Sequence, residues 1–362
     1  MDAWGRLMDA TESPPTDPVT EARPPIPLVS TRGLLGAAFD LLLRSSAEMR
    51  RASFYIGAIT LGTVGPLALG TWGVIVVGMD RSDGEMETLF SQAAGGPFVI
   101  LVAVALAGLL VATVESRTLA TAILGGTMAG RPIGTRRALA RSRRTFWRAV
   151  VASVLVGVIL TVAQNGLDLV VGPALVGAEE ATLLTSTLLT ALIGAPFAYL
   201  LAGVVLGDVD PFEALRRSFR MYGVRRMAAV VIVVFETFAA LLILFGIGTG
   251  VDLVLRLFDT LGIGPEADAT GIAVATAGIV AIVFAFGTLL FTVMAVTVAP
   301  QVVMFLGLTH ASFGLDLVAT GGPDDPDITP PARRRFRWFT VPMLVAFVVA
   351  GIALAAMLAA YG

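Results

Sequence analysis

The chain has 362 residues, of which 56% are hydrophobic and 14% are charged, and its mean hydropathy is +0.85. A water-soluble domain of this length needs far more polar surface, so the composition excludes an ordinary globular protein and predicts one surrounded by lipid. The chain contains no Cys and a single His, His310. Disulfides, cysteine nucleophiles and multi-histidine metal sites are therefore excluded, and we expect neither a metal nor a cofactor.

The first part of the chain predicts a tail followed by a surface helix. Residues 1–30 are rich in proline and acidic residues without apolar periodicity, which is typical of a disordered cytoplasmic tail. No apolar segment follows a basic start, so we expect no cleaved signal peptide. From about Thr31 to Arg51 the apolar residues recur at helical spacing, which predicts a helix lying along the membrane interface.

Seven apolar stretches follow, each long enough for the ~20 residues that a spanning helix needs. We place them at residues 53–79, 97–129, 149–172, 182–206, 227–250, 271–299 and 338–360. The predicted fold is an all-α, polytopic transmembrane helix bundle of about seven spans, with six or eight as alternatives. Residues 31–320 would form the bundle, residues 321–337 a cytoplasmic loop and residues 338–362 the final span.

The distribution of arginine predicts the orientation. With the N-terminus inside, 23 of the 25 arginines fall on the cytoplasmic side, against Arg81 and Arg256 outside. Counting Arg117 as intramembrane changes the split to 22 against 2. Because basic residues near span ends stay in the cytoplasm, we expect a cell-membrane protein with a cytoplasmic N-terminus and an external C-terminus.

A basic motif precedes several of the apolar stretches. Its first clear copy is Ala138, Leu139, Arg141, Ser142 and Arg144. It recurs 76 positions later as Ala214, Leu215, Arg217, Ser218 and Arg220. A fainter copy is Leu42, Arg44 and Ser45. The spacing predicts an internal repeat in which cytoplasmic amphipathic interfacial helices, including one at residues 131–148, bend into the spans that follow.

Three ionisable residues fall within predicted spans at mid-membrane depth: Glu115, Arg117 and Glu236. A charge at that depth costs at least ~2.5 kcal/mol, so we expect the three to pair in one cluster. The cluster is either a proton, ion or headgroup site or an interhelical clamp. If the second span ended at residue 114, Glu115 and Arg117 would be ordinary interfacial residues.

The basic helices predict contacts to anionic lipid headgroups, to a nucleotide or to an acidic partner, with simple topogenic and lipid-anchoring use as the alternative. The residues concerned are Arg137, Arg141, Arg144, Arg148, Arg216, Arg217 and Arg220. No folded reader domain accompanies this charge, so we expect no nucleic acid partner. A segment from Val302 to Val318, which carries His310, reads as a further interfacial or re-entrant piece. Gln164, Asn165 and Asp168 read as the outer end of a span meeting water.

The motif resembles that of a broad group of prokaryotic membrane proteins. The likeness includes the small-residue pairs before each copy, Gly126 with Gly130 and Gly203 with Gly207, and the Asp210-Pro211 turn before the second copy. On these residues the chain is similar to the membrane domain of some glycerophosphodiester phosphodiesterases, to the uncharacterised YciC-like proteins and to related domains of unknown function in salt-adapted archaea. The likeness covers about residues 97–300. Because a soluble phosphodiesterase domain is missing, the resemblance implies no hydrolase activity.

Taken together, the sequence favours a non-enzymatic membrane protein that organises lipid or a partner complex through its basic inner face. The alternative is a transporter or permease whose site is the intramembrane charged cluster. An intramembrane enzyme is a third and weaker hypothesis, because the chain shows no catalytic motif that we recognise. The expected partners are membrane lipids. The sequence does not say whether a protein partner or a second copy binds.

Overall fold

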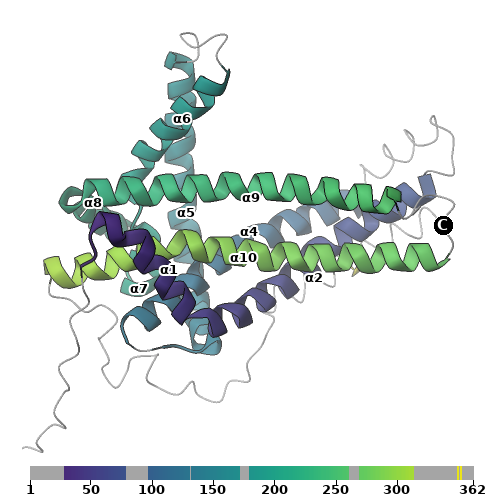
Figure 1. Ribbon diagram of the computed structural model, residues 1–362, viewed down its shortest axis with the longest axis horizontal. Helices are drawn as coiled ribbons and strands as arrows, with labels where there is room; N and C mark the ends of the chain where they lie inside the picture. Colours follow the sequence, from purple (N-terminus) through teal and green to yellow (C-terminus); the bar gives the residue numbers. More distant parts are fainter. Residues whose placement is uncertain are drawn as a thin grey trace, which may run out of the picture.

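The computed structural model describes residues 28–78, 97–130, 132–171, 179–260 and 269–313, together with 349, 351 and 352. Regular structure in these ranges is helical, without a strand (Figure 1). Five helical segments in them are long and apolar enough to cross a membrane. They are Ser46–Gly73, Phe98–Met128, Thr135–Gly166, Leu188–Gly207 and Ala273–Ala311. The predicted all-α membrane class is confirmed at this level.

The principal elements, in chain order, are a short 3-10 helix η2 and a series of α-helices with one further 3-10 turn. Their bounds are η2 Thr31–Gly33, α1 Leu34–Arg44, α2 Ser46–Gly78, α4 Pro97–Met128, α5 Thr135–Val171, α6 Glu179–Gly194, η4 Ala195–Phe197, α7 Leu200–Gly207, α8 Pro211–Val224, α9 Arg226–Thr260 and α10 Ala269–Phe313. Five of the seven predicted spans coincide with the five apolar segments. The stretch at 227–250 lies within α9, which is helical but is not one of the five.

Several predicted regions fall outside the described residues. They are most of the N-terminal tail, the loop between the first and second predicted spans, the loop at 321–337 and almost all of the last span at 338–360. The predictions made for these regions therefore stay predictions.

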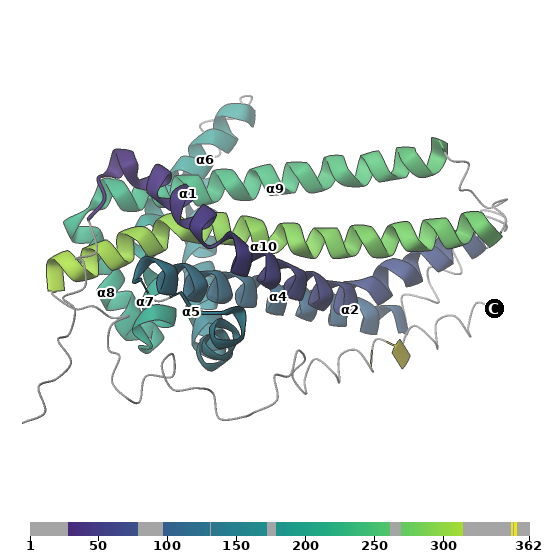
Figure 2. The same ribbon diagram turned by 60° about the horizontal axis from the view of Figure 1, so that its bottom comes forward.

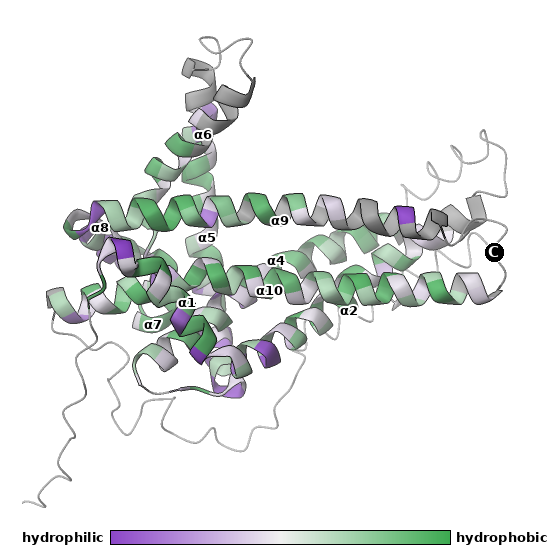
Figure 3. Ribbon diagram, viewed as in Figure 1, coloured by the Kyte–Doolittle hydropathy of each residue, from purple (hydrophilic) through white to green (hydrophobic). Residues whose placement is uncertain are grey.

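The hydrophobic core lies where the basic ends of the helices meet. It joins α1 to the starts of α2 and α9, the end of α4, α7, and the second half of α10. Figure 3 shows hydrophilic residues gathered around α1, α8 and the start of α2, whereas α9 and α10 are largely hydrophobic where they are described. Farther along α9 the apolar side chains are exposed, among them Phe238 and Phe245 at 61% and 75%. Surfaces of this kind are stable against lipid and not against water.

The apolar helices do not all run in one direction. In Figures 1 and 2, α2, α4, α9 and α10 extend from the core toward one side, while α5 and α6 leave it across that direction. Helices that cross one bilayer lie within about 40° of its normal. In a parallel bundle of these helices, α5 and α6 would therefore have to run along the same direction as α2, α4, α9 and α10.

One close crossing fixes α2 against α10. A Cβ added to Gly287 would lie 2.7 Å from Cβ of Thr60 and 2.8 Å from Cα of Gly57. A Cβ on Gly57 would in turn lie 2.8 Å from Cγ2 of Thr288. Small residues at such a crossing allow two backbones to touch, which is a common way for membrane helices to associate.

The structure corrects the prediction for the last described helix. A span at 271–299 and a separate interfacial segment from Val302 were expected, but α10 runs without interruption to Phe313. Pro300 removes one backbone hydrogen bond and usually kinks or ends a helix. Here residues 301–309 are all buried, and their packing holds the helix together beyond the proline. The segment from 302 to 309 therefore belongs to the core.

The predicted bend between the first clear copy of the motif and its span is also wrong. Residues 135–171 form the single helix α5, because no Gly or Pro occurs between Thr135 and Gly157 to break it. Two other junctions do break the helix. Ser45 separates α1 from α2, and Arg225, with φ −140° and ψ 70°, separates α8 from α9.

The fourth predicted span, at 182–206, is discontinuous. α6 ends at Gly194, the 3-10 turn η4 follows, and α7 begins at Leu200. Pro196 lies in the turn and has no backbone N–H to donate. The break leaves peptide groups that a regular helix would have satisfied, and these have to find partners elsewhere in the protein.

Candidate functional site

The serines of the three motif copies are all buried. Ser45, Ser142 and Ser218 are 4%, 0% and 1% exposed. Ser142 Oγ lies 2.5 Å from Thr118 Oγ1 on α4, whereas Ser45 donates to the carbonyl of Leu41 in the preceding turn. In the first clear copy the serine thus ties a basic segment to the preceding apolar helix.

Ser218 completes the broken span. Its hydroxyl donates to the carbonyl of Pro196 at 2.6 Å and accepts from the backbone N–H of Tyr199 at 3.2 Å. One side chain of α8 thereby satisfies peptide groups on both sides of the break between α6 and α7. A buried peptide group left without a hydrogen-bond partner at this break would cost ~1–3 kcal/mol.

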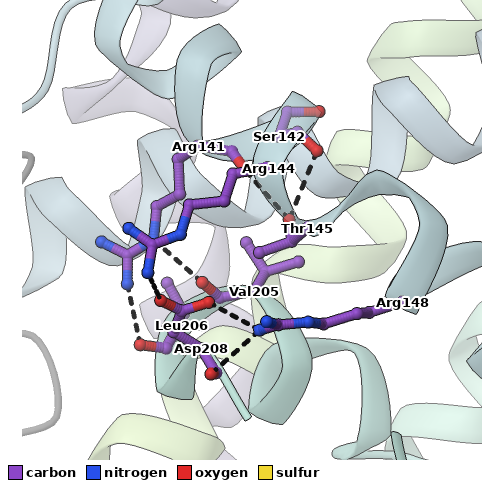
Figure 4. Close-up of polar contacts among 8 residues, drawn as sticks. All are labelled: Arg141, Ser142, Arg144, Thr145, Arg148, Val205, Leu206 and Asp208. Atoms are coloured by element: carbon purple, nitrogen blue, oxygen red, sulfur yellow. Dashed lines mark hydrogen bonds and ion pairs between the residues drawn. The ribbon is translucent and has the colours of Figure 1, made fainter. Parts of the chain in front are cut away.

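Three arginines of α5 bind the C-terminal end of α7, and we call this set the arginine clamp: Arg141, Arg144 and Arg148 with Asp208. Figure 4 shows the three guanidinium groups converging on this end. Arg141 donates from Nε to the carbonyl of Val205 at 2.9 Å and from Nη2 to that of Leu206 at 2.8 Å. The last carbonyls of a helix have no partner within it, and its C-terminus carries partial negative charge. The guanidinium groups of the clamp supply the hydrogen-bond donors that these carbonyls lack and the positive charge that this helix end favours.

Asp208 is the anionic part of the clamp. Its carboxylate pairs with Arg144 and, at 2.8 Å, with Arg148, and Arg148 also donates to its carbonyl at 3.1 Å. Asp208 caps α7 in the left-handed conformation, with φ 48°. Asp and Asn tolerate this conformation better than other non-glycine residues, so Asp208 supplies both the turn and the charge.

The clamp changes the reading of the basic residues. Arg141, Arg144 and Arg148 were expected at lipid headgroups, but the structure uses them to join α5 to α7. Arg217 donates to Glu213 at 3.0 Å, and this hydrogen bond holds the pKa of the Glu213 carboxyl below its usual value. Of the seven predicted arginines, four are exposed: Arg144, which belongs to the clamp, and Arg137, Arg216 and Arg220.

Glu48 makes an equivalent contact at the start of α5, and sequence reasoning did not find it. The backbone N–H of Thr135 donates to Glu48 Oε2 at 2.7 Å, and the Thr135 hydroxyl lies 2.5 Å from the same oxygen. A carboxylate at a helix N-terminus is favourable. The spacing from Ser45 to Glu48 is that of a capping box within one helix, so the sequence signal points to the wrong partner.

The predicted cluster of three intramembrane charges is divided between two sides of α4. Arg117 pairs with Glu236 of α9, and Gln301 of α10 donates to the same carboxylate at 3.0 Å. Glu115 lies two residues earlier, and such positions are about 200° apart around a helix. The structure therefore brings Arg117 and Glu236 together and gives Glu115 other partners.

The partners of Glu115 come from α2 and α5. Tyr55 donates to Glu115 at 3.2 Å, and Nε of Arg143 lies 3.9 Å from the carboxylate. Arg143 also donates to the hydroxyl of Tyr55 at 3.3 Å. Tyr55, Arg143 and Gln301 were not among the predicted residues. A Tyr or Gln within an apolar run is a signal that could have singled out Tyr55 and Gln301.

The remaining predicted polar residues do not gather into a site. Gln164 and Asn165 are exposed, the side chain of Asp168 lies outside the described part, and His310 is half-buried. Among the described residues no group of three or more His, Cys, Asp or Glu side chains is placed to hold a metal ion.

A groove of about 700 Å³ opens beside the clamp, between α5 and the start of α8. We call it the α5–α8 groove. Its lining combines exposed apolar side chains with charged ones. The residues are Trp147, Arg148, Val151, Asp210, Pro211, Phe212, Glu213 and Arg216. A surface of this composition suits an amphiphile at a membrane interface.

Comparison with known proteins finds no match: no family model, no curated protein and no solved structure is similar to the chain. The functional argument therefore rests on the residues themselves.

Glu236→Gln tests the intramembrane pair. The variant leaves Arg117 without a counter-ion, so we expect the free energy of unfolding to fall by ~1–3 kcal/mol, measured by thermal unfolding in detergent. The matched control is Glu213→Gln, which removes a solvent-exposed pair and should change stability far less, because water screens that pair. Equal stability of the two variants would contradict a structural role for the Arg117–Glu236 pair.

Proposed function

We propose that the protein is a multi-pass integral membrane protein without enzymatic activity, whose basic helix ends organise anionic lipid at the cytoplasmic leaflet. The observation that carries the proposal is the α5–α8 groove, where exposed aromatic side chains lie beside the exposed guanidinium group of Arg216 and the partly buried one of Arg148. Trp147 and Phe212 are 75% and 71% exposed, and Arg216, which lines the same groove four residues after Phe212, is exposed as well. Aromatic and basic side chains are the usual anchors at the headgroup level.

The internal contacts support this role. The arginine clamp joins α5 to α7, and Ser218 joins α8 to the break before α7. These two links hold α5 and α8 in a fixed relation, so the groove between them has a defined shape. Each further Arg near an anionic leaflet adds ~1 kcal/mol of attraction, and Arg216 and Arg220 are placed to supply it.

The proposal includes the topology inferred from charge: seven spans, a repeated unit of basic helix and span, the N-terminus in the cytoplasm and the C-terminus outside. It also includes a relationship to the YciC-like group. The separate helices α1 and α8, each ahead of a long apolar helix, are compatible with interfacial helices of such a repeat.

The topology can be tested because the chain lacks cysteine. Single cysteines replace Arg220 and Glu85, and a membrane-impermeant thiol reagent is applied to intact cells and to inside-out vesicles. We expect position 85 to react only in cells and position 220 only in the vesicles. Reaction of both positions from one side would contradict the topology.

Lipid preference tests the function. Purified protein in neutral detergent should be stabilised more by phosphatidylglycerol than by phosphatidylcholine, because guanidinium groups attract the anionic headgroup. The double variant Arg216→Gln, Arg220→Gln should lose most of this difference. Arg256→Gln, far along α9 from the basic ends, is the control and should retain it. Equal stabilisation of the unmodified protein by both lipids would overturn the proposal.

A transporter is the second candidate, and two observations favour it. Arg117, Glu236 and Gln301 form a polar contact among three apolar helices, and a discontinuous helix lies beside α9, where Gly194 approaches Val233. Broken helices near buried charges mark substrate sites in many transporters. This candidate requires Glu236→Gln to abolish flux of a solute in proteoliposomes even at temperatures where the variant is fully folded. Unchanged flux would exclude Glu236 as its site.

A further inference from the structure

We infer that the α5–α8 groove is a binding site for one phospholipid with a phosphoglycerol headgroup. This inference rests on the proposed lipid-organising function and specifies which lipid the groove selects. The apolar walls, the charged groups without a hydrogen bond or close ion pair, and the net charge of the groove each point to this occupant.

Two charged groups of the groove make no side-chain hydrogen bond or close ion pair in the described part of the chain, although Arg216 acts electrostatically on Glu213 three residues earlier. Arg216 is exposed and makes no ion pair there, in contrast to Arg148 and Arg217, which bind Asp208 and Glu213. Asp210 is the N-cap residue of α8, yet its side chain makes no capping hydrogen bond. An N-cap Asp normally accepts from the first turn of its helix, so this carboxylate keeps its acceptor capacity for another donor.

The two groups impose different requirements on an occupant. A guanidinium group binds a phosphodiester through charge-assisted hydrogen bonds. A carboxylate repels a bare phosphate and favours a headgroup that brings hydroxyl or ammonium donors. The ligand that satisfies Arg216 and Asp210 together therefore carries a phosphate and, beyond it, hydrogen-bond donors.

The net charge decides between hydroxyl and ammonium donors. The groove and its paired residues hold the guanidinium groups of Arg144, Arg148, Arg216 and Arg217. Against these four stand the three carboxylates of Asp208, Asp210 and Glu213. The resulting charge of +1 is matched by a headgroup of charge −1 with neutral donors. Phosphoglycerol has this charge, whereas phosphoethanolamine is neutral.

The outer face of α5 offers a track for an acyl chain. Val151 lines the groove, and Val154, Val158 and Val162 continue from it at helical spacing. These four side chains are 50%, 55%, 56% and 67% exposed. The row extends about 16 Å along the helix. A lipid whose headgroup lies at Arg216 can therefore lay a chain along α5.

The test compares lipids with identical acyl chains, titrated into the detergent-solubilised full-length protein and followed by native mass spectrometry. The probes are phosphatidylglycerol, phosphatidic acid, phosphatidylethanolamine and phosphatidylcholine. We expect phosphatidylglycerol to bind about tenfold more tightly than phosphatidic acid, the anionic lipid that lacks the glycerol hydroxyls beyond the phosphate. Asp210→Asn should reduce this ratio to within about twofold by weakening the hydroxyl contact. Arg216→Gln should weaken both lipids, and the control Arg256→Gln, far along α9 from the groove, should leave both affinities and their ratio unchanged.

The contrary outcomes are distinct. A ratio that Asp210→Asn does not change, or tighter binding of phosphatidylethanolamine than of phosphatidylglycerol, overturns the assigned headgroup while the general preference for anionic lipid stands. Equal binding of anionic and zwitterionic lipids overturns both the headgroup assignment and the proposed function.

Discussion

The end of α7 is the point on which the rest of the described structure depends. A helix end inside an apolar protein leaves carbonyl groups that neither lipid nor its own turns can satisfy. In this chain Arg141 and Arg148 of α5 donate hydrogen bonds to these carbonyls. Arg144 and Arg148 also pair with the carboxylate of Asp208, the residue that caps α7. Once α5 is bound to α7 in this way, α8 can close the break before α7 through Ser218, and the α5–α8 groove takes its shape.

The same constraint explains where the core lies. Guanidinium groups are costly to bury without partners, and they are placed where peptide carbonyls and carboxylates are available to them. The basic ends of the helices therefore pack against one another, while the apolar lengths beyond them are exposed for lipid to cover. In a water-soluble protein the distribution of buried and exposed residues would be the reverse.

The sequence was sufficient for the all-helical class and for the approximate positions of five apolar segments, because hydropathy over about 20 residues is a local property. It was insufficient for the contacts of the arginines. A row of arginines before a span has the same pattern whether it faces headgroups or the end of another helix. The difference depends on the break at Pro196 and on where α7 then ends, and both follow from tertiary packing. Tertiary packing also explains α10, because the burial of residues 301–309 keeps the helix intact beyond Pro300.

Of the candidate site, only the pairing of Arg117 with Glu236 could be predicted from the sequence. Arg117 and Glu236 were expected to meet and they do, since a charge at mid-membrane depth needs a partner. Glu115 was assigned to the same cluster, although its position two residues before Arg117 turns it to another side of α4. Its contacts with Tyr55 and Arg143 required knowledge of which helices flank α4. No linear spacing provides that knowledge.

A double-mutant cycle on Arg148 and Asp208 tests the central claim, that arginines hold the helix ends together inside the protein. Arg148→Gln, Asp208→Asn and the double variant are compared by unfolding in detergent, and Asn retains the left-handed turn. Because both side chains are about one third exposed, we expect a coupling energy of ~1–2 kcal/mol. The exposed pair Arg44 and Asp40 should give less than about 0.5 kcal/mol. A coupling energy at the clamp no larger than that of the surface pair would contradict the account.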